Sequence, residues 1–327
     1  MGSENKGGST KMSKSIMACA GIDTGKHKLD VAVDHSEERL QIENTATGHR
    51  RLSSWLRRQN VGRVGIEASG GYEQPVVAKL RGDGFVVIVF QPAQVRGYAK
   101  FHGKRAKNDR IDAALIAACA AETRTVRAPP DPRLSAFATH LTLIEQITED
   151  MARFKTRCET CRDPRLRQIW ENRILEFKAV LKAEFARLVQ AIRQHDDLAQ
   201  RLDLIGSVNG VGLRTAVAIL VRMPEIGRVS REHIASLAGL APFDDDSGDR
   251  VGERHIKDGR GRVRHSLFAA ALAASFRWNV ELIALYRRLT AKGKPHKVVL
   301  VACARKMLIF VNTVVQRGTP WVEKQPA

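Results

Sequence analysis

The sequence predicts an α/β N-terminal domain, followed by a charged helical arm and a mostly α-helical C-terminal domain. Apolar and polar residues alternate from Met17 to about Thr45, which is the period of β-strands. Short apolar runs and amphipathic stretches then alternate up to residue 122, which indicates strand–helix crossovers. Three prolines in the stretch 128–133 interrupt the chain, and a long charged pattern of helical period follows them.

The order of the N-terminal elements predicts a particular fold. Three strands joined by short turns come first, at 17–23, 29–35 and 40–45. They are followed in turn by a helix (48–60), a strand that begins at residue 63 and ends at Glu67, a helix (71–84), a strand (85–91) and two helices (92–103 and 108–122). A meander that leads into β-α-β crossovers is the layout of the ribonuclease H-like, or RuvC-like, fold. Active sites of open sheets of this kind gather at strand ends.

We expect five segments: a disordered leader (1–16), the RuvC-like domain (17–128), a helical coiled-coil arm (129–204), a C-terminal domain (205–320) and a tail (321–327). In the arm, apolar residues recur at spacings of four, three and four, which is typical of a coiled-coil seam: Leu181, Phe185, Leu188 and Ile192. Asp163-Pro164 predicts a break between two helices of a hairpin. We interpret this hairpin as an arm that dimerises, binds nucleic acid, or does both.

The composition points to a polyanionic partner. The 327 residues include 54 Lys and Arg against 35 Asp and Glu, a formal charge of +19. Nucleic acid is the first candidate, and a generically basic protein is the alternative. Five cysteines with a lone CxxC at Cys158 and Cys161 predict neither a disulfide framework nor a zinc site. We find no signal peptide and no apolar run of roughly 18 residues, so we expect a bacterial cytoplasmic, nucleoid-associated protein with no membrane partner.

Four carboxylates stand where phosphodiester chemistry needs them. Asp23 and Glu67 each end a predicted strand, and Asp109 and Asp112 lie three apart on one predicted helix. Divalent ions can stabilise the attacking and leaving oxygens of a phosphate, and Mg²⁺ prefers oxygen ligands. Each residue alone would be an ordinary turn, surface or capping residue. Together they predict a metal site for Mg²⁺, with Mn²⁺ as the alternative.

Six blocks of the sequence resemble one protein family. They are GIDTGKHKLDVAV (21–33), VGIEASGGYEQPVVAKL (64–80), KNDRIDAALIA (107–117), IGSVNGVGLRTAVAIL (205–220), GLAPFDDDSG (239–248) and IKDGRGRVRHSLFAAALAA (256–274). These blocks are similar to the motifs of the DEDD, RuvC-like transposases of the IS110 family, to which the Piv-type DNA invertases are related. The resemblance runs from Met17 to Val315 and is weakest in the helical middle.

The resemblance implies a site-specific recombinase that excises and inserts a mobile element. It implies that the four carboxylates bind the metal and that Ser247 attacks a DNA phosphate to form a covalent phosphoserine. It also implies a dimer or tetramer in which the RuvC-like domain of one subunit works with the serine domain of another. The implied partners are donor DNA, target DNA and a bridge RNA. On residue type alone, Ser247 in Asp-Asp-Asp-Ser-Gly would be an ordinary turn serine.

Further residues are candidates for nucleic-acid contacts. Gly210 and Gly212 would either let backbone amides approach a phosphate or form a tight helix–helix turn. Two basic runs would either contact phosphates or remain solvated: Lys104, Arg105 and Lys107 before the Asp pair, and Arg260, Arg262 and Arg264 before a C-terminal helix.

Two features depart from the family pattern. Asp244, Asp245 and Asp246 directly precede Ser247 and would either repel the DNA phosphate or help it approach the metal. Asp258 stands before Gly259-Arg260 where the family often has Gly-Gly-Arg, which puts the local loop geometry in question.

Three other functions share parts of this pattern. A RuvC-like nuclease or junction resolvase would use the same carboxylates with metal-bound water and would not need Ser247. A Piv-type invertase would invert a DNA segment instead of moving one. A nucleic-acid-binding protein with a degenerate catalytic fold would need neither the carboxylates nor the serine.

Overall fold

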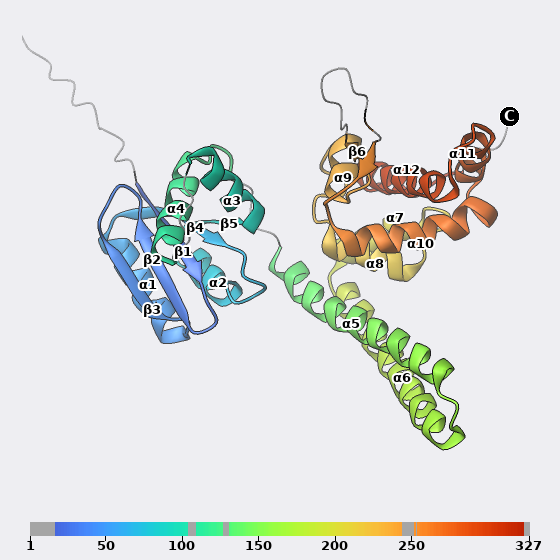
Figure 1. Cartoon of the computed structure of the whole chain (residues 1–327). Coiled ribbons are helices and arrows are strands. Elements are labelled where there is room, and N and C mark those ends of the chain that lie inside the picture. Colours follow the sequence, from blue (N-terminus) through green and yellow to red (C-terminus); the bar gives the residue numbers. More distant parts are fainter. Residues whose placement is uncertain (1–16, 104–108, 127–130, 244–251, 253, 324–327) are drawn as a thin grey trace, which may run out of the picture. The chain divides into compact units, whose positions relative to one another are not determined.

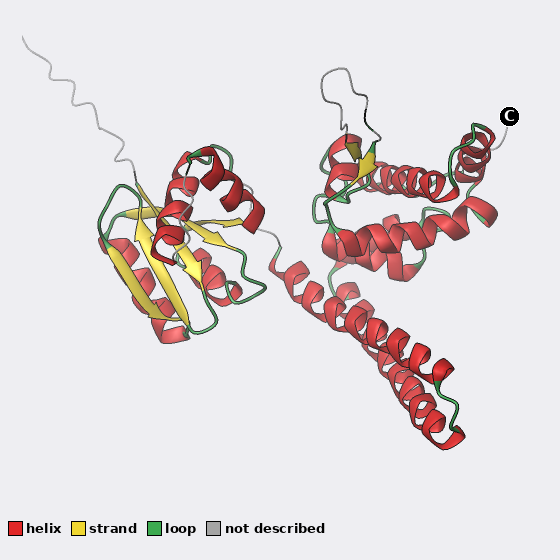
Figure 2. Cartoon of the chain, in the orientation of Figure 1, coloured by secondary structure: helices red, strands yellow, loops and turns green. Residues whose placement is uncertain are grey.

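The chain forms two compact units, Met1–Ala128 and Pro129–Ala327 (Figure 1). The computed structural model describes residues 17–103, 109–126, 131–243, 252 and 254–323, without the side chains of 109–111. The predicted leader (1–16) and residues 324–327 of the predicted tail therefore lie outside the described residues. The first unit combines a sheet with helices, and the second is almost entirely helical (Figure 2).

The first unit is built on a five-stranded sheet of order β3-β2-β1-β4-β5. Strands β1 (Ala18–Thr24), β2 (Lys28–Val33) and β3 (Arg39–Glu43) form an antiparallel meander. Strands β4 (Val61–Glu67) and β5 (Val86–Phe90) continue the sheet in parallel with β1. This order and these directions are those of the ribonuclease H-like fold, so the predicted fold class is confirmed.

Helices cover both faces of this sheet. Helices α1 (Ala46–Arg58) and α2 (Gln74–Gly82) bury apolar side chains against the face that carries Ala20, Ile22, Val64 and Ile66. Helices α3 (Pro92–Phe101) and α4 (Asp109–Glu122) cover the other face. Helix α2 begins three residues later than predicted, because Gly70 and Gly71 take positive φ angles that do not fit a helix.

The second unit begins with a helical hairpin. Helices α5 (Pro132–Thr160) and α6 (Pro164–Arg193) pack against each other, and the side chain of Asp163 caps the start of α6 at the predicted break. The predicted seam lies inside this chain, since Leu181, Leu188 and Ile192 are buried in a core shared with the helices that follow. The four-three-four spacing therefore has an explanation within one subunit, and dimerisation through the arm stays a prediction.

The rest of the second unit is a helical bundle with one short hairpin. Its elements are α7 (Asp196–Gly206), α8 (Leu213–Arg222), α9 (Arg231–Leu237), β6 (Pro242–Phe243), β7 (His255–Ile256), α10 (Gly261–Arg277), α11 (Val280–Ala291) and α12 (His296–Arg317). Their apolar faces share one core with the base of the α5–α6 hairpin.

Helix α12 corrects one expectation from the sequence. Its best 18-residue window has a mean hydropathy of 2.0, so it is long and apolar enough to cross a membrane, and the bent pair α10–α11 passes the same test together. The sequence was expected to contain no apolar run of this length, because Arg305 and Lys306 interrupt this one. Cys303, Met307 and Val311 are fully buried in the bundle, as expected for the central helix of a helical core.

Candidate active site

Two of the predicted carboxylates lie at the ends of neighbouring strands: Glu67 is the last residue of β4, and Asp23 is the last but one of β1. Strands β1 and β4 run in parallel with Ile22 opposite Ile66, so Asp23 and Glu67 are the next residues along the two strands. Both side chains are half-buried, and both make polar contacts within the chain. The two carboxylates therefore stand at the same edge of the sheet, as the strand-end argument predicts.

Two glycines explain how α4 approaches these strands. Gly21 and Gly65 are register partners on β1 and β4. A Cβ added to Gly21 would lie 2.1 Å from the Ala113 carbonyl oxygen and 2.2 Å from the Ala117 nitrogen, and one added to Gly65 would lie 2.9 Å from the Ile116 oxygen. The backbone of α4 thus rests on the sheet itself. Because side chains alternate along a strand, Asp23 and Glu67 lie on this same face.

The direction of α4 brings its first turn to the carboxylate edge. The Arg63 guanidinium, near the start of β4, donates to the Ala120 and Thr123 carbonyls at 3.1 and 3.0 Å, at the end of α4. The beginning of α4 therefore lies toward the opposite end of the strands, where they finish. Asp112 is in that first turn, and Asp109 is the first residue of the helix. The side chain of Asp109 lies outside the described residues.

The described side chains alone do not complete a metal site. Among them, no group of three or more His, Cys, Asp or Glu residues is arranged to hold a metal ion. Three of the four predicted ligands are described, and all have the carboxylate oxygens that hard divalent ions prefer. Binding of a metal by Asp23, Glu67, Asp109 and Asp112 stays a prediction.

A further carboxylate, Asp30, lies beside Asp23. These two residues are register partners on β1 and β2, so their side chains lie on the same face of the sheet. Asp30 is buried, accepts a 2.6 Å hydrogen bond from Gln41 and pairs with Lys28 at 3.1 Å. The sequence analysis missed Asp30, although its place opposite Asp23 follows from the predicted hairpin once the turn length is known.

Glu73 organises the loop that follows Glu67. Its Oε2 accepts hydrogen bonds from the Ser69 amide (3.0 Å), the Ser69 hydroxyl (3.0 Å) and the Gly71 amide (2.9 Å). Burial raises the pKa of Glu73, but hydrogen bonds from its own amide and from Ser69 and Gly71 outweigh it, so the pKa lies below its usual value. Glu73 is therefore an ionised support for the loop after the site, a role that the sequence analysis did not predict.

Ser247 belongs to a segment outside the described residues. The same holds for Asp244, Asp245 and Asp246, and for Lys104, Arg105 and Lys107 in the first unit. The described strands on either side of the serine segment pair with each other, with Pro242 opposite Ile256 and Phe243 opposite His255. Lys257 adds a cation–π contact 5.2 Å from the Phe243 ring. The structure thus describes the β6–β7 pair that flanks the segment containing Ser247.

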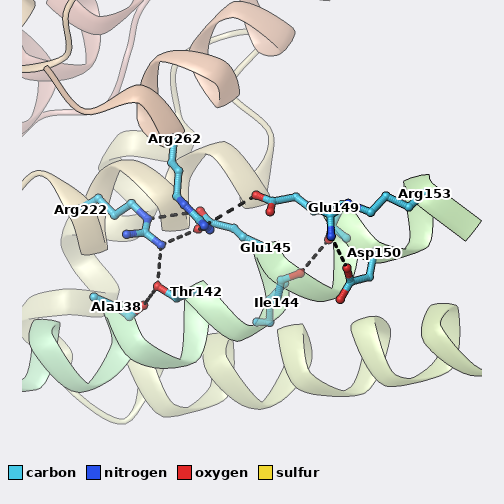
Figure 3. Close-up of polar contacts among 10 residues, drawn as sticks. Ala138, Thr142, Ile144, Glu145, Glu149, Asp150, Arg153, Arg222 and Arg262 are labelled. Atoms are coloured by element: carbon cyan, nitrogen blue, oxygen red, sulfur yellow. Dashed lines mark hydrogen bonds and ion pairs between the residues drawn. The ribbon is translucent and has the colours of Figure 1, made fainter. Parts of the chain in front are cut away.

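The three arginines of the second unit that were predicted to contact phosphates all have partners within the chain. Arg260 makes a two-pronged pair with Glu225 at 2.6 and 2.7 Å, and Arg264 donates to the Asp258 carbonyl at 2.6 Å. Arg262 reaches from α10 to Glu145 and Glu149 on α5, beside Arg222 of α8 (Figure 3). These contacts give each arginine a structural role, and nucleic-acid binding by them stays a prediction.

Gly210 and Gly212 have different roles in the turn between α7 and α8. Gly210 has a φ of 94°, and a Cβ added to it would lie 2.3 Å from the Cβ of Ala274 on α10. It therefore permits close packing of the turn against α10. Gly212 caps α8, and no atom lies within 4 Å of an added Cβ, so its surroundings remain open.

Asp258 explains the departure from the Gly-Gly-Arg pattern. Its φ is 56°, in the left-handed region where glycine is favoured and aspartate is tolerated. The next residue, Gly259, also has a positive φ and lies against the backbone of Gly239, where a Cβ would come within 2.3 Å of the nitrogen. The aspartate therefore keeps a glycine-like backbone at this position.

Comparison with known proteins assigns the family. One family model, described as a transposase of the DEDD type of IS110, matches residues 20–163. A second, described as the transposase IS116/IS110/IS902 family, matches residues 202–287. The chain belongs to the IS110 family of transposases. It is accordingly a DNA-recombining enzyme with a ribonuclease H-like first unit.

Relatives of this IS110 transposase include DNA-inverting proteins. It is 25% identical over 311 residues to the pilin gene-inverting proteins of Moraxella bovis and Moraxella lacunata, which covers 92% of this chain and 96% of each relative. It is 30% identical over 128 residues to an uncharacterised 43.6 kDa protein of the insertion element IS110 from Streptomyces coelicolor, over 38% of this chain and 31% of that protein.

Solved structures of RuvC from T. thermophilus also match. The RuvC in complex with a Holliday junction substrate overlaps 31% of this chain and 90% of its own, at 17% identity and a TM-score of 0.26. The ribonuclease H-like fold of the first unit is defined by its strand order, β3-β2-β1-β4-β5.

Proposed function

We propose that this IS110 transposase moves an insertion sequence by site-specific recombination, with a carboxylate metal site in its first unit and Ser247 as its nucleophile. The docking of α4 on Gly21 and Gly65 carries the proposal. It directs the first turn of α4, which holds Asp109 and Asp112, toward the end of the sheet where β1 and β4 finish and where Asp23 and Glu67 lie. This direction of α4 supports the proposal that the family's four DEDD carboxylates converge on one site.

The four carboxylates would hold Mg²⁺, or Mn²⁺ in its place. The bound ion would act as a Lewis acid toward a DNA phosphate. The residues of this chain supply the rigid frame: the β1–β4 pair fixes Asp23 and Glu67, α4 carries Asp109 and Asp112 in its first turn, and Glu73 holds the loop after Glu67. A frame built on a sheet and a helix positions ligands more precisely than a loop does.

Ser247 would cut and rejoin DNA without an external energy source. Its Oγ gives up a proton and bonds to a DNA phosphorus as the bond from phosphorus to one strand end breaks. The released strand end takes up a proton and leaves as a hydroxyl. Attack on the phosphoserine by the hydroxyl of another strand end reverses these steps, restores the backbone and frees the serine. The number of phosphodiester bonds is conserved.

We infer that the working enzyme is a homo-oligomer, a dimer or tetramer, acting on donor and target DNA in the bacterial cytoplasm and nucleoid with a bridge RNA as guide. Asp23 and Ser247 belong to different units of the chain. If the metal residues of one subunit act with Ser247 of another, a mixture of Asp23→Ala and Ser247→Ala proteins regains activity, because some sites then carry no substitution. Sites formed within one subunit would leave the mixture inactive.

A strand-exchange assay on donor and target plasmids tests the mechanism. Ser247→Ala and Asp23→Ala should each abolish exchange, and Ser54→Ala, an exposed serine on α1, should not. On denaturing gels, the native enzyme incubated with labelled DNA should show a covalent protein–DNA adduct, and the Ser247→Ala variant should not. Full exchange by either site variant would overturn the mechanism. Metal-dependent cutting without an adduct would instead identify a RuvC-like nuclease or resolvase.

A second candidate is DNA inversion. It is favoured by the similarity to the pilin gene-inverting proteins, which extends over 92% of this chain. Plasmids that carry the recombination sites in inverted orientation on one molecule separate the two functions. Inversion there, without exchange between molecules, would identify a Piv-type invertase.

A further inference from the structure

Helices α10 and α11 of the second unit meet at a sharp corner. The two helices are bent by 90° at Trp278 and Asn279. Asn279 is buried and locks the corner, because its side chain accepts from the Leu282 amide and donates to the Asn209 carbonyl, both at 3.1 Å. The corner is therefore a fixed feature of the bundle (Figure 1).

Aromatic and apolar side chains are exposed at this corner. Phe276 is 52% exposed and Trp278 is 56% exposed, and Leu272 and Val280 on either side of them are also exposed. Phe276 packs against Tyr286 with ring centroids 4.7 Å apart, and the Tyr286 hydroxyl is 2.7 Å from Nδ1 of His296. We call Phe276, Trp278, Tyr286 and His296 the aromatic corner. Large rings so exposed in a folded protein mark an interaction surface.

The charge around the aromatic corner is strongly positive. Residues 261–323 contain 11 Lys and Arg but only two acidic residues, Glu281 and Glu323. Glu323 accepts a hydrogen bond from the Val280 amide at 3.1 Å, so its carboxylate is engaged at the start of α11. Six of these basic residues are exposed, in the stretch from the end of α10 to the start of α12: Arg277, Arg287, Arg288, Lys292, Lys294 and Lys297.

We propose that the aromatic corner binds an unpaired segment of nucleic acid, with bases stacked on Trp278 and Phe276 and phosphates held by the surrounding Lys and Arg. Exposed rings next to basic residues are how proteins hold single strands, because every base has a flat face and every linkage a negative charge. A duplex is a poorer fit, since its bases are stacked on one another. A second copy of this surface would bring like charges together.

This inference rests on the proposed function only for its partner class, a DNA or RNA strand. It uses neither the carboxylates nor Ser247. Asp23→Ala and Ser247→Ala should therefore retain single-strand binding even where they abolish strand exchange. Loss of exchange and loss of single-strand binding can thus be measured separately.

Fluorescence anisotropy with the full chain tests the proposal. The probes are oligothymidine and oligouridine of about 20 nucleotides, longer than a binding site of this kind, and a matched abasic strand that keeps only the phosphates. The native protein should prefer strands with bases to the abasic strand. Trp278→Ala should weaken binding about fivefold or more and remove that preference, whereas Trp278→Phe should keep it. Leu175→Ala, an exposed apolar residue on α6, is the matched control.

Two results would overturn the proposal. In the first, the native protein binds the base-containing and abasic strands with equal Kd, and the Kd values of Trp278→Ala and Phe276→Ala lie within about twofold of the native value. A change of this size is well below the effect of one stacked base. The other is a loss of self-association by these variants in sedimentation with no change in strand binding, which would make the corner a protein interface. Comparison of oligouridine with oligothymidine tells whether RNA or DNA is the preferred strand.

Discussion

Gly21 of β1 and Gly65 of β4 are register partners, and helix α4 lies with its backbone directly on both. Two glycines opposite each other leave a strip of sheet without side chains, and the helix sits closer than any other residue pair would permit. Two residues further along the same strands stand Asp23 and Glu67. The close spacing between sheet and helix next to the candidate metal site therefore depends on the absence of a Cβ atom at Gly21 and at Gly65.

Gly21→Ala should displace α4 and disturb the site together. The added Cβ would lie 2.1 Å from the Ala113 carbonyl oxygen, which is backbone and cannot rotate away. We expect a loss of about 1–3 kcal/mol of stability, as for an overpacked core, with a fall in recombination activity. Chemical denaturation monitored by circular dichroism measures the loss of stability, and the strand-exchange assay measures the activity. Gly97→Ala in α3, where nothing lies within 4 Å of the new Cβ, should be neutral or stabilising. Equal effects of the two substitutions would contradict this account of α4 packing.

Divalent metal should stabilise the folded protein through the carboxylate edge. A ligand that binds only the native state at about 100 times its Kd adds roughly 2.7 kcal/mol. Titration with MgCl₂ or MnCl₂ should therefore raise Tm, and the double variant Asp23→Asn with Glu67→Gln should lose most of the rise. The control is Glu37→Gln with Glu38→Gln, which removes the same charge from exposed positions of the same unit. An unchanged rise in the site variant would place the metal elsewhere.

The sequence predicted the first unit well because its signals are local. Alternation along β1, β2 and β3, and apolar runs at β4 and β5, were enough to predict the five strands in chain order, with Glu67 at the end of β4 and Asp23 one residue before the end of β1. The close approach of α4 was not predicted, since Gly21 and Gly65 are far apart in the chain and only the sheet register pairs them.

In the second unit the sequence predicted the residues better than their partners. Arg262 was expected either to contact phosphate or to remain solvated, and in the structure its side chain pairs with Glu145, 117 residues earlier in the chain. Its contact with phosphate stays a prediction. The apolar seam of α6 was expected in an arm that dimerises, binds nucleic acid, or does both, and Leu181, Leu188 and Ile192 of this seam are buried within one chain. Those two roles of the arm stay predictions. The spacing of charged or apolar residues in the sequence predicts whether a side chain will form an ion pair or an apolar contact. Which partner supplies it depends on packing between distant segments.

Glu73→Gln should weaken the loop after Glu67 in a pH-dependent way. The folded-state pKa of Glu73 is lowered, so its stabilisation is present above the unfolded pKa and is lost as pH falls through the lower, folded value. At pH 7 the variant should lose about 1–3 kcal/mol, because three hydrogen bonds to a carboxylate are weakened. The difference from the native protein should shrink in acid, below the usual titration range of glutamate. Urea denaturation at a series of pH values measures it, with exposed Glu37→Gln as control. A difference that stays constant with pH would show that Glu73 does not act through its charge.

Glu145→Gln should loosen the connection of the arm to α8 and α10. The Glu145 carboxylate accepts from Arg222 of α8 and from Arg262 of α10, and Arg222 is only 19% exposed (Figure 3). Removing the charge leaves a largely buried guanidinium without its counter-ion, which should cost about 1–3 kcal/mol. Asp150→Asn, which breaks the exposed pair with Arg153 on the same helix, should cost no more than about 1 kcal/mol. Urea denaturation of both variants gives the comparison, and hydrogen exchange should show faster opening of α5 near Thr142 in Glu145→Gln alone. Equal losses in the two variants would mean that the connection is no stronger than a surface ion pair.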